Sequence, residues 1–316
     1  MDILKIGSIQ AAPGEKARGY LEVPGTDVKI PLTLIHGARE GKTVVITGGT
    51  HGGEYPGIET SIRLARDLKP ENVHGRVIVV HPVNTPAFFA KLQYIGPHDG
   101  KNLNRMFPGQ ATGTVTQRIA YAISSQLFTI ADYYFDLHGG DLHEALEPFV
   151  IYSTLGSDEQ NALSLKLAKA LGIRYVCASI SANGTFGCAA TMGVAGFLGE
   201  IGQCGLWSEA DVASYYDGIL NVLRLCGTLY GDARDNTSAV QLERMVGLEA
   251  QKTGCWYPSV KPGEQVTVHE KVGEIRDCFG DTLQECAAPE TGVVLYVASS
   301  LAIMEGDPLV AVGKIV

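Results

Sequence analysis

A histidine and a glutamate three positions apart are the first residues in the chain whose types and spacing could do chemistry. They are His51 and Glu54, in the glycine-rich turn GGTHGGE. An imidazole and a carboxylate presented together can supply two of the three protein ligands of a catalytic zinc ion. The pair would equally fit an ordinary polar turn in which a glutamate starts a helix.

The elements that flank this turn would place the pair at a ligand-binding position. Residues 44–46 form a β-branched run, which is typical of a buried parallel strand. Pro56 suits the first turn of a helix. Apolar residues then recur at helical spacing, at Ile58, Ile62, Ala65 and Leu68. The pair is therefore expected at the carboxyl end of a strand, where open α/β sheets bind ligands.

A second histidine and a second glutamate stand at other predicted strand ends. His138 ends the run Phe135-Asp136-Leu137-His138 and is followed by two glycines. Side chains two apart on a strand face the same way, so Asp136 could support His138, although a structural histidine would look the same. Glu200 lies in the otherwise apolar segment FLGEIG, where burying an unpaired carboxylate would be costly.

An arginine in a long irregular segment could bind an anionic substrate. Residues 84–113 are rich in Pro, Gly and Asn, and loops of this length in compact domains are usually functional. Within them, Arg105 of Asn-Leu-Asn-Arg can present a planar fork of donors to a carboxylate, or it can be a surface arginine in a turn. Arg63, on the predicted helix, could approach the same pocket or lie exposed.

Together these residues predict a zinc hydrolase site with one ion per chain. His51, Glu54 and His138 make a His/Glu/His ligand set with a fourth position open for water, as in carboxypeptidase A and thermolysin. Zinc polarises a carbonyl and lowers the pKa of bound water, while a free carboxylate transfers the proton. Glu200 is the candidate for that transfer, and Arg105 would anchor a substrate carboxylate beside the scissile amide.

Strands and helices alternate from residue 43 to about residue 230, which predicts an α/β fold. Strands are expected at 76–83, 132–138, 148–152, 174–178 and 196–202, and helices at 113–130, 158–171 and 209–229. This order predicts a mixed, mostly parallel central sheet with helices on both faces. An alternating pattern around Pro24-Gly25 predicts a hairpin at the edge of the sheet.

The last part of the chain has a different pattern. After residue 236, short valine-containing runs alternate with turns, which predicts a small all-β, barrel-like domain at 236–316 behind a catalytic domain at 1–235. The pattern resembles biotinyl and lipoyl carrier barrels. A carrier needs a modifiable lysine at a hairpin tip, and no lysine stands between Lys271 and Lys314. We therefore expect a structural or lid-forming barrel.

Composition bounds the class of protein. At 316 residues and 45% hydrophobic content, the chain can form one large α/β domain or two domains. A net charge of −9 argues against a general nucleic-acid surface. No signal or membrane-spanning run is recognised, and seven cysteines without a CxxC pair fit reduced thiols, so we expect a cytoplasmic enzyme that does not bind membranes. A homo-oligomer is compatible with the acidic surface and the edge hairpin.

Four motifs, in this order, resemble the succinylglutamate desuccinylase and aspartoacylase family of zinc-carboxypeptidase-like enzymes. They are GGTHGGE, Asn104-Arg105 with Phe107-Pro108-Gly109, Asp136-Leu137-His138, and Glu200-Ile201-Gly202. The resemblance covers residues 44–202, and the β domain looks like that of the family. It implies zinc ligation by His51, Glu54 and His138, and substrate carboxylate binding by Arg105 with Asn104 nearby. It also implies general acid/base work by Glu200.

One position departs from the pattern of that family. Its members often carry Asp-Leu-Asn-Arg, whereas this chain has Asn102 in place of the aspartate. The amide removes a negative charge beside Arg105. We therefore expect Asn102 to be one of the residues that bind the substrate and determine which substrate is accepted. His81 and His98 flank or enter the irregular segment and could touch substrate, and Cys204 follows Glu200 closely enough to be a candidate nucleophile.

The leading hypothesis is a zinc-dependent amidohydrolase that removes an N-acyl group from a small acylated amino acid. The resemblance implies that the β domain narrows the pocket, which favours small substrates over long peptides. A metallocarboxypeptidase acting on short peptides would use the same zinc, glutamate and arginine. A non-catalytic binding or sensing protein is the alternative of another class, and Glu200 argues against it because a pure binding site needs no proton shuttle. The acyl group and the amino acid are left open.

Overall fold

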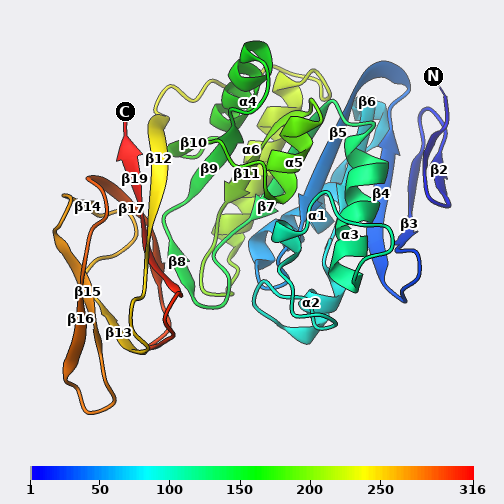
Figure 1. Cartoon of the computed structure of the whole chain (residues 1–316). Helices are drawn as coiled ribbons and strands as arrows, with labels where there is room; N and C mark the ends of the chain where they lie inside the picture. The colour runs from blue at the N-terminus through cyan, green and yellow to red at the C-terminus, as the bar shows by residue number, and fades with distance from the viewer. Residues whose placement is uncertain (1) are drawn as a thin grey trace.

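The computed structural model describes residues 2–316 and contains a 13-stranded mixed sheet that runs through the molecule (Figure 1). Its centre follows the order β10-β9-β11-β7-β5-β6. These strands are β10 (Tyr175–Ser179), β9 (Phe149–Ser153), β11 (Ala195–Glu200), β7 (Tyr133–His138), β5 (Arg39–Gly48) and β6 (His74–Val80). Every neighbouring pair among them is parallel except β9 and β11. The predicted α/β fold with a mixed, mostly parallel central sheet is confirmed.

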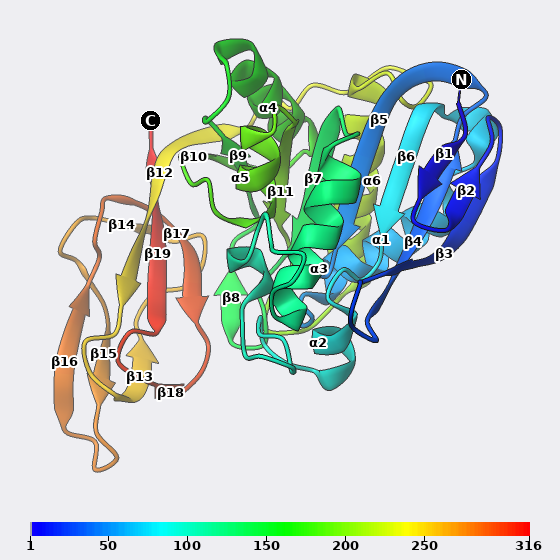
Figure 2. The ribbon, with the colours of Figure 1, turned by 45° about the vertical axis from the view of Figure 1, so that its right-hand side comes forward.

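Helices cover both faces of this sheet (Figure 2). One face carries α1 (Tyr55–Asp67), α4 (Asp158–Ala170) and α6 (Glu209–Leu225). The other carries α3 (Val115–Ile123), the π-helical turn η3 (Ser124–Phe128) and α5 (Gly184–Thr191). The alternation of side chains along β5 explains this arrangement, because Val44 and Ile46 share a core with α1 whereas Val45 shares one with α3.

The segment 84–113, which the sequence predicted to be irregular, contains two short helices. These are α2 (Thr85–Ala90) and the 3-10 helix η2 (Leu103–Arg105). The side chain of Asn84 caps α2 by accepting from the backbone NH of Ala87, and the side chain of Asn102 caps η2. Helices of six and three residues are too short to show a helical period in the sequence, which explains the difference.

The amino-terminal strands lie at one edge of the sheet. β3 (Lys16–Glu22) and β4 (Lys29–His36) form an antiparallel hairpin, as the sequence predicted, and β4 pairs with β6. β1 (Leu4–Ile6) and β2 (Ile9–Ala11) form a separate two-stranded sheet. No helix within residues 2–316 is long and apolar enough to cross a membrane.

The chain after residue 236 is all-β, as predicted, and it continues the central sheet. β12 (Val240–Glu249) is parallel to β10 and antiparallel to β19 (Pro308–Ile315). Beyond β19 come β17 (Gly292–Ala298) and β14 (Gln265–Val266), and β8 (Glu144–Leu146) pairs with β17. A second sheet contains β13 (Gly254–Pro258), β15 (Lys271–Arg276), β16 (Thr282–Ala287) and β18 (Ala302–Ile303). The two sheets enclose a separate core around Trp256, and we call residues 236–316 the β domain.

Candidate metal centre

The predicted site residues lie where three neighbouring strands end. His51 and Glu54 follow β5 in the turn before α1, whereas His138 is the last residue of β7 and Glu200 the last of β11. β5, β7 and β11 are adjacent and parallel, and Glu200 stands opposite His138 in the register. Because parallel strands end at one edge of a sheet, residues far apart in the sequence meet there.

The turn between β5 and α1 needs glycine at three positions, Gly49, Gly52 and Gly53. Gly49 has a φ of +78°, and a Cβ there would lie 2.6 Å from the ring of Pro82. At Gly53 a Cβ would lie 2.1 Å from Oδ1 of Asp141. The glycines therefore let the turn pass close to its neighbours and set the direction of the His51 and Glu54 side chains.

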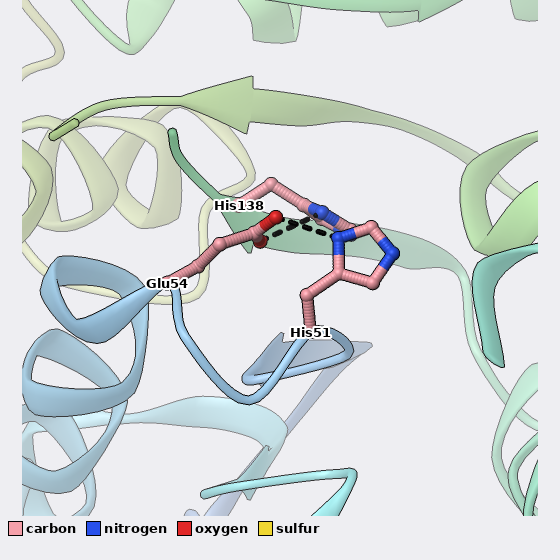
Figure 3. Close-up of side chains that lie close together, drawn as sticks. All are labelled: His51, Glu54 and His138. Carbon is pink, nitrogen blue, oxygen red and sulfur yellow. Dashed lines mark hydrogen bonds and ion pairs between the residues drawn. The ribbon is translucent and has the colours of Figure 1, made fainter. Parts of the chain in front are cut away.

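The donor atoms of His51, Glu54 and His138, which we call the ligand cluster, converge on one point (Figure 3). Nδ1 of His51 lies 2.6 Å from Oε1 of Glu54, and Nδ1 of His138 lies 2.9 Å from Oε2. One ligand atom from each residue lies within 4.8 Å of the others. All three residues are buried, with at most 9% of their surface exposed. The structure thus brings together the three side chains that the sequence predicted as metal ligands.

Asp136 holds His138 from the opposite side of the ring. Its Oδ2 lies 2.9 Å from Nε2 of His138, and its carboxylate also accepts the hydroxyl groups of Thr47 and Thr185. Burial would raise the pKa of Asp136, but His138 and these hydroxyls outweigh it and lower that pKa. The charged carboxylate fixes the proton on Nε2, so that Nδ1 of His138 turns its lone pair to the ligand cluster.

The ligand cluster fits a divalent cation. Each oxygen of Glu54 is buried against one imidazole nitrogen, Oε1 against His51 and Oε2 against His138. Burial would raise the pKa of Glu54, but the two imidazoles outweigh it and lower the pKa to about 2, so the carboxylate is charged. A charged carboxylate between two imidazole nitrogens is the donor set that zinc takes in hydrolases, although other divalent ions accept it as well.

Glu200 faces the same space as the ligand cluster. Burial raises its pKa well above the usual value, and the carboxylates of Glu54 and Glu144 act in the same direction against the opposing effect of His138. A carboxyl group whose proton affinity is raised in this way is suited to taking up a proton and giving it back. The role of Glu200 in proton transfer stays a prediction.

A cavity of about 450 Å³, the site cavity, joins these groups to the predicted substrate residues. Arg105, Asn104 and Asn102 line it together with the ligand cluster and Glu200. Arg105 is exposed and forms no ion pair within the described part of the chain. Asn104 is buried, and its Oδ1 accepts the backbone NH of Thr185 at 2.9 Å, so α5 fixes this side chain.

A larger hollow of about 650 Å³ lies beside α1 and α2. Its walls are mostly apolar side chains, such as Phe89 and Trp207, and none of the predicted site residues lines it. The residues that could do chemistry therefore line the smaller of these two hollows.

The structure does not bring Arg63 to the site cavity. Its guanidinium donates to Glu59 at 2.7 Å and to both carboxylate oxygens of Glu209 at 2.7 and 2.9 Å. These contacts join α1 to the start of α6 on the outer surface. Helical periodicity does not show which way a side chain points when it lies between the buried and the exposed face of a helix. Arg63 was therefore predicted as a possible substrate residue.

Three further candidates also lie outside the walls of the site cavity. His81 is partly buried, and its Nε2 lies 3.1 Å from Oγ1 of Thr33. His98 is exposed in the loop after α2. The thiol of Cys204 lies 3.6 Å from the hydroxyl of Ser299.

Comparison with known proteins places this geometry in a family. The family model for the succinylglutamate desuccinylase/aspartoacylase catalytic domain matches residues 40–226, a range that contains the ligand cluster, Arg105 and Glu200. The chain belongs to this family. The family predicted from the motifs is thereby confirmed.

Relatives resemble the chain over nearly its whole length. An N-alpha-acetyl-L-2,4-diaminobutyric acid deacetylase of Halomonas elongata is 30% identical, over 94% of this chain and 91% of the relative. A succinylglutamate desuccinylase structure from Silicibacter has a TM-score of 0.87 at 28% identity and covers 99% of this chain and 100% of that one. The product-bound ectoine utilization protein EutE of Ruegeria pomeroyi has the same TM-score and identity, with 98% and 100% covered. The likeness therefore includes the β domain.

The position at which this family member departs from the motif supports the ligand cluster. Oδ1 of Asn102 lies 3.1 Å from Nε2 of His51 and also accepts the backbone NH of Asn104. An amide oxygen can only accept a hydrogen bond, so Nε2 of His51 must carry the proton. Nδ1 of His51 then has a free lone pair that points to the ligand cluster. Asn102 lines the site cavity, but its side chain orients a predicted metal ligand, a role that the sequence analysis did not anticipate.

We expect Asn102→Ala to weaken zinc binding by about 10- to 100-fold, because the orienting partner of His51 is lost. Asn102→Asp should hold zinc at least as tightly as the wild type, since a carboxylate accepts more strongly than an amide. Competition with a zinc-binding dye at fixed pH measures both affinities. Asn72→Ala, at an exposed asparagine of the turn before β6, is the control. Equal affinity in Asn102→Ala and the control would contradict this role.

Part of the site cavity was not predicted from the sequence. Its remaining walls include Tyr94, Glu144 of β8 and Tyr296 of β17. A strand of three residues shows no alternation, and only the folded structure places β8 against β17. The contribution of Tyr296 agrees with the implied narrowing of the pocket by the β domain.

Proposed function

We propose that this protein is a zinc-dependent amidohydrolase that removes an N-acyl group from a small acylated amino acid. One observation carries the proposal: the ligand cluster, Glu200 and Arg105 line the same cavity. Membership of a family whose named relatives include a deacetylase and a desuccinylase supports an amide of an acylated amino acid as the substrate.

Each residue has a separate task in the proposed reaction. His51, Glu54 and His138 would hold one zinc ion, which polarises the acyl carbonyl and lowers the pKa of bound water. Glu200 takes a proton from the attacking water and delivers it to the amide nitrogen as the C–N bond breaks. Arg105 binds the carboxylate of the amino acid and thereby holds the amide in place for attack.

The walls of the site cavity favour a short substrate. Tyr296, Pro308 and Val310 of the β domain line it together with the residues at the strand ends. Side chains of the β domain in these walls support the acyl amino acid over the peptide alternative. The name of the Halomonas relative makes N-acetyl-2,4-diaminobutyrate the first compound to test.

The test is release of primary amine by the zinc-loaded protein from acetyl, succinyl and longer-acyl amino acids, with matched tripeptides alongside. We expect turnover of at least one acyl amino acid and none of the tripeptides. Trimming of tripeptides without deacylation would establish a carboxypeptidase instead. No turnover with zinc fully bound would favour a binding protein.

We expect Arg105→Ala to lower kcat/KM for an acyl amino acid by about 10- to 100-fold, mainly through KM, because a charge-assisted contact to the carboxylate is lost. The kcat/KM of Arg105→Lys should lie between those of the wild type and Arg105→Ala, since lysine keeps the charge but not the planar fork of donors. The substrate carboxamide should be insensitive to both changes. Arg63→Ala is the matched control, and an equal loss in that variant would remove the special role of Arg105.

A further inference from the structure

Glu144 is a carboxylate at the wall of the site cavity that has no task in the proposed reaction. It begins β8, and its side chain faces the same space as Arg105 and Glu200. Oε2 accepts the backbone NH of Asp141 at 3.1 Å, which is the only side-chain hydrogen bond of Glu144 within residues 2–316. No lysine, arginine or histidine of the described chain lies within ion-pairing distance of it. The group is therefore partly buried and without a cationic partner.

The neighbouring Asp141 shows the contrast. Its two oxygens accept the backbone NH groups of Tyr94 and Leu142, both at 2.7 Å, so this buried carboxylate is satisfied by the loops it joins. Oε1 of Glu144, in contrast, accepts no hydrogen bond within residues 2–316. Burial, with the nearby charge of Glu54, raises the pKa of Glu144 to about 7, which shows that its surroundings disfavour the charge unless a cation arrives.

The chemistry of the substrate class indicates which group would arrive. The α-carbon of an acylated amino acid carries the acylamino group, the carboxylate and the side chain. The ligand cluster with Glu200 accounts for the first and Arg105 for the second. The side chain is left to face the remaining walls, which include Tyr94, Glu144 and Tyr296.

The space beside Glu144 can take such a side chain. A smaller pocket of about 80 Å³ continues from the site cavity and shares Tyr94, Glu144, Tyr296 and Pro308 with it. The hydroxyl of Tyr296 donates to the carbonyl oxygen of Pro308, which leaves its own lone pairs free to accept. A carboxylate and a phenol oxygen are both acceptors, and a primary ammonium brings three donors.

We propose that Glu144 is a specificity residue that binds the positively charged side chain of the substrate, so that the enzyme acts on Nα-acyl diamino acids with a short side chain. This inference rests on the proposed deacylase function and adds to it the residue that reads the side chain. An ion pair in a partly buried cavity discriminates strongly, because a neutral side chain would leave the carboxylate unpaired.

The experiment compares two isosteric substrates of the zinc-loaded full chain. Nα-acetyl-2,4-diaminobutyrate ends in an ammonium, and Nα-acetylnorvaline ends in a methyl group at the same position. We expect wild-type kcat/KM to favour the charged substrate by about 30-fold or more. Glu144→Gln should lower that ratio to within a few-fold. Glu147→Gln is the matched control, because Glu147 follows on the same segment but points toward Gly263 and lines neither pocket.

The outcomes separate this inference from the function on which it rests. If the wild type deacetylates both substrates with equal efficiency, the deacylase stands and the role of Glu144 is overturned. A wild-type preference that survives in Glu144→Gln also overturns it, since another group must then read the charge. No release of amine from either substrate, with zinc bound, would overturn the deacylase and this inference together. Turnover of the norvaline derivative by Glu144→Gln, with normal zinc content, shows that the variant is folded.

Discussion

Glu200→Gln is expected to lower kcat for deacylation by about 10²-fold or more while the zinc content stays at the wild-type level. The amide has nearly the shape of the carboxylate but cannot take a proton from water. Glu200 ends β11 in the site cavity, but it does not belong to the ligand cluster, so its replacement should leave the metal in place. The measurement is amine release under saturating substrate, with zinc determined in the same samples.

The comparison variant for Glu200 is Glu147→Gln, which makes the same chemical change outside the site cavity. Its kcat for deacylation should equal that of the wild type. Wild-type kcat in Glu200→Gln would mean that another group transfers the proton. A rise in KM with unchanged kcat would assign Glu200 to substrate binding instead.

His138→Ala is expected to abolish detectable deacylation, because the ligand cluster loses one of its three donors. Removing zinc from the wild type with a chelator should do the same, and adding zinc should restore activity. Zinc at about 1,000 times its Kd should stabilise the wild type by about 4 kcal/mol through binding to the folded state. His138→Ala should lose that stabilisation, which thermal unfolding with and without zinc measures without reference to activity.

His98→Ala is the matched control for this metal prediction. His98 is exposed and lies outside the site cavity, so its loss should leave both zinc stoichiometry and the thermal shift unchanged. An identical thermal shift in His138→Ala and the control would exclude His138 as a ligand. Full activity of the zinc-free protein would remove the metal from the proposed reaction.

The chemically active part of the site was readable from the sequence because its residues stand next to strong strand patterns. β-branched and aromatic runs before His51 and His138 mark buried strands, and glycines mark where they end. The carboxyl ends of parallel strands share one edge, so residues from β5, β7 and β11 were expected to meet there. Glu200 was recognisable because a carboxylate is out of place in an apolar strand.

The contacts that hold the site residues in place could not be predicted from the sequence, because they come from segments with weak hydrophobic periodicity. The helix α5, GTFGCAAT, is built of small residues and shows little apolar periodicity, so neither the helix nor the contacts of Thr185 to Asp136 and Asn104 were predicted. The pairing of Asn102 with His51 joins positions 51 residues apart through side chains alone. Arg63 shows the opposite case, in which a sound helix prediction left the direction of a side chain open.

The division into two domains stays a prediction, because one strand belongs to both parts. Five of the ten residues of β12 are polar or glycine, so its sequence does not mark it as the next strand of the central sheet. Its partner β10 lies far earlier in the chain. Long-range pairing of this kind is decided by the whole fold and leaves no local mark.

The double attachment of the β domain has a consequence for how molecules reach the metal centre. β12 is bonded to β10, and β8, from the earlier part of the chain, is bonded to β17. A swinging motion of the β domain would have to break both ladders of backbone hydrogen bonds at once. We therefore expect the opening to the site to keep its shape when substrate binds, so that it selects molecules by their dimensions and charge.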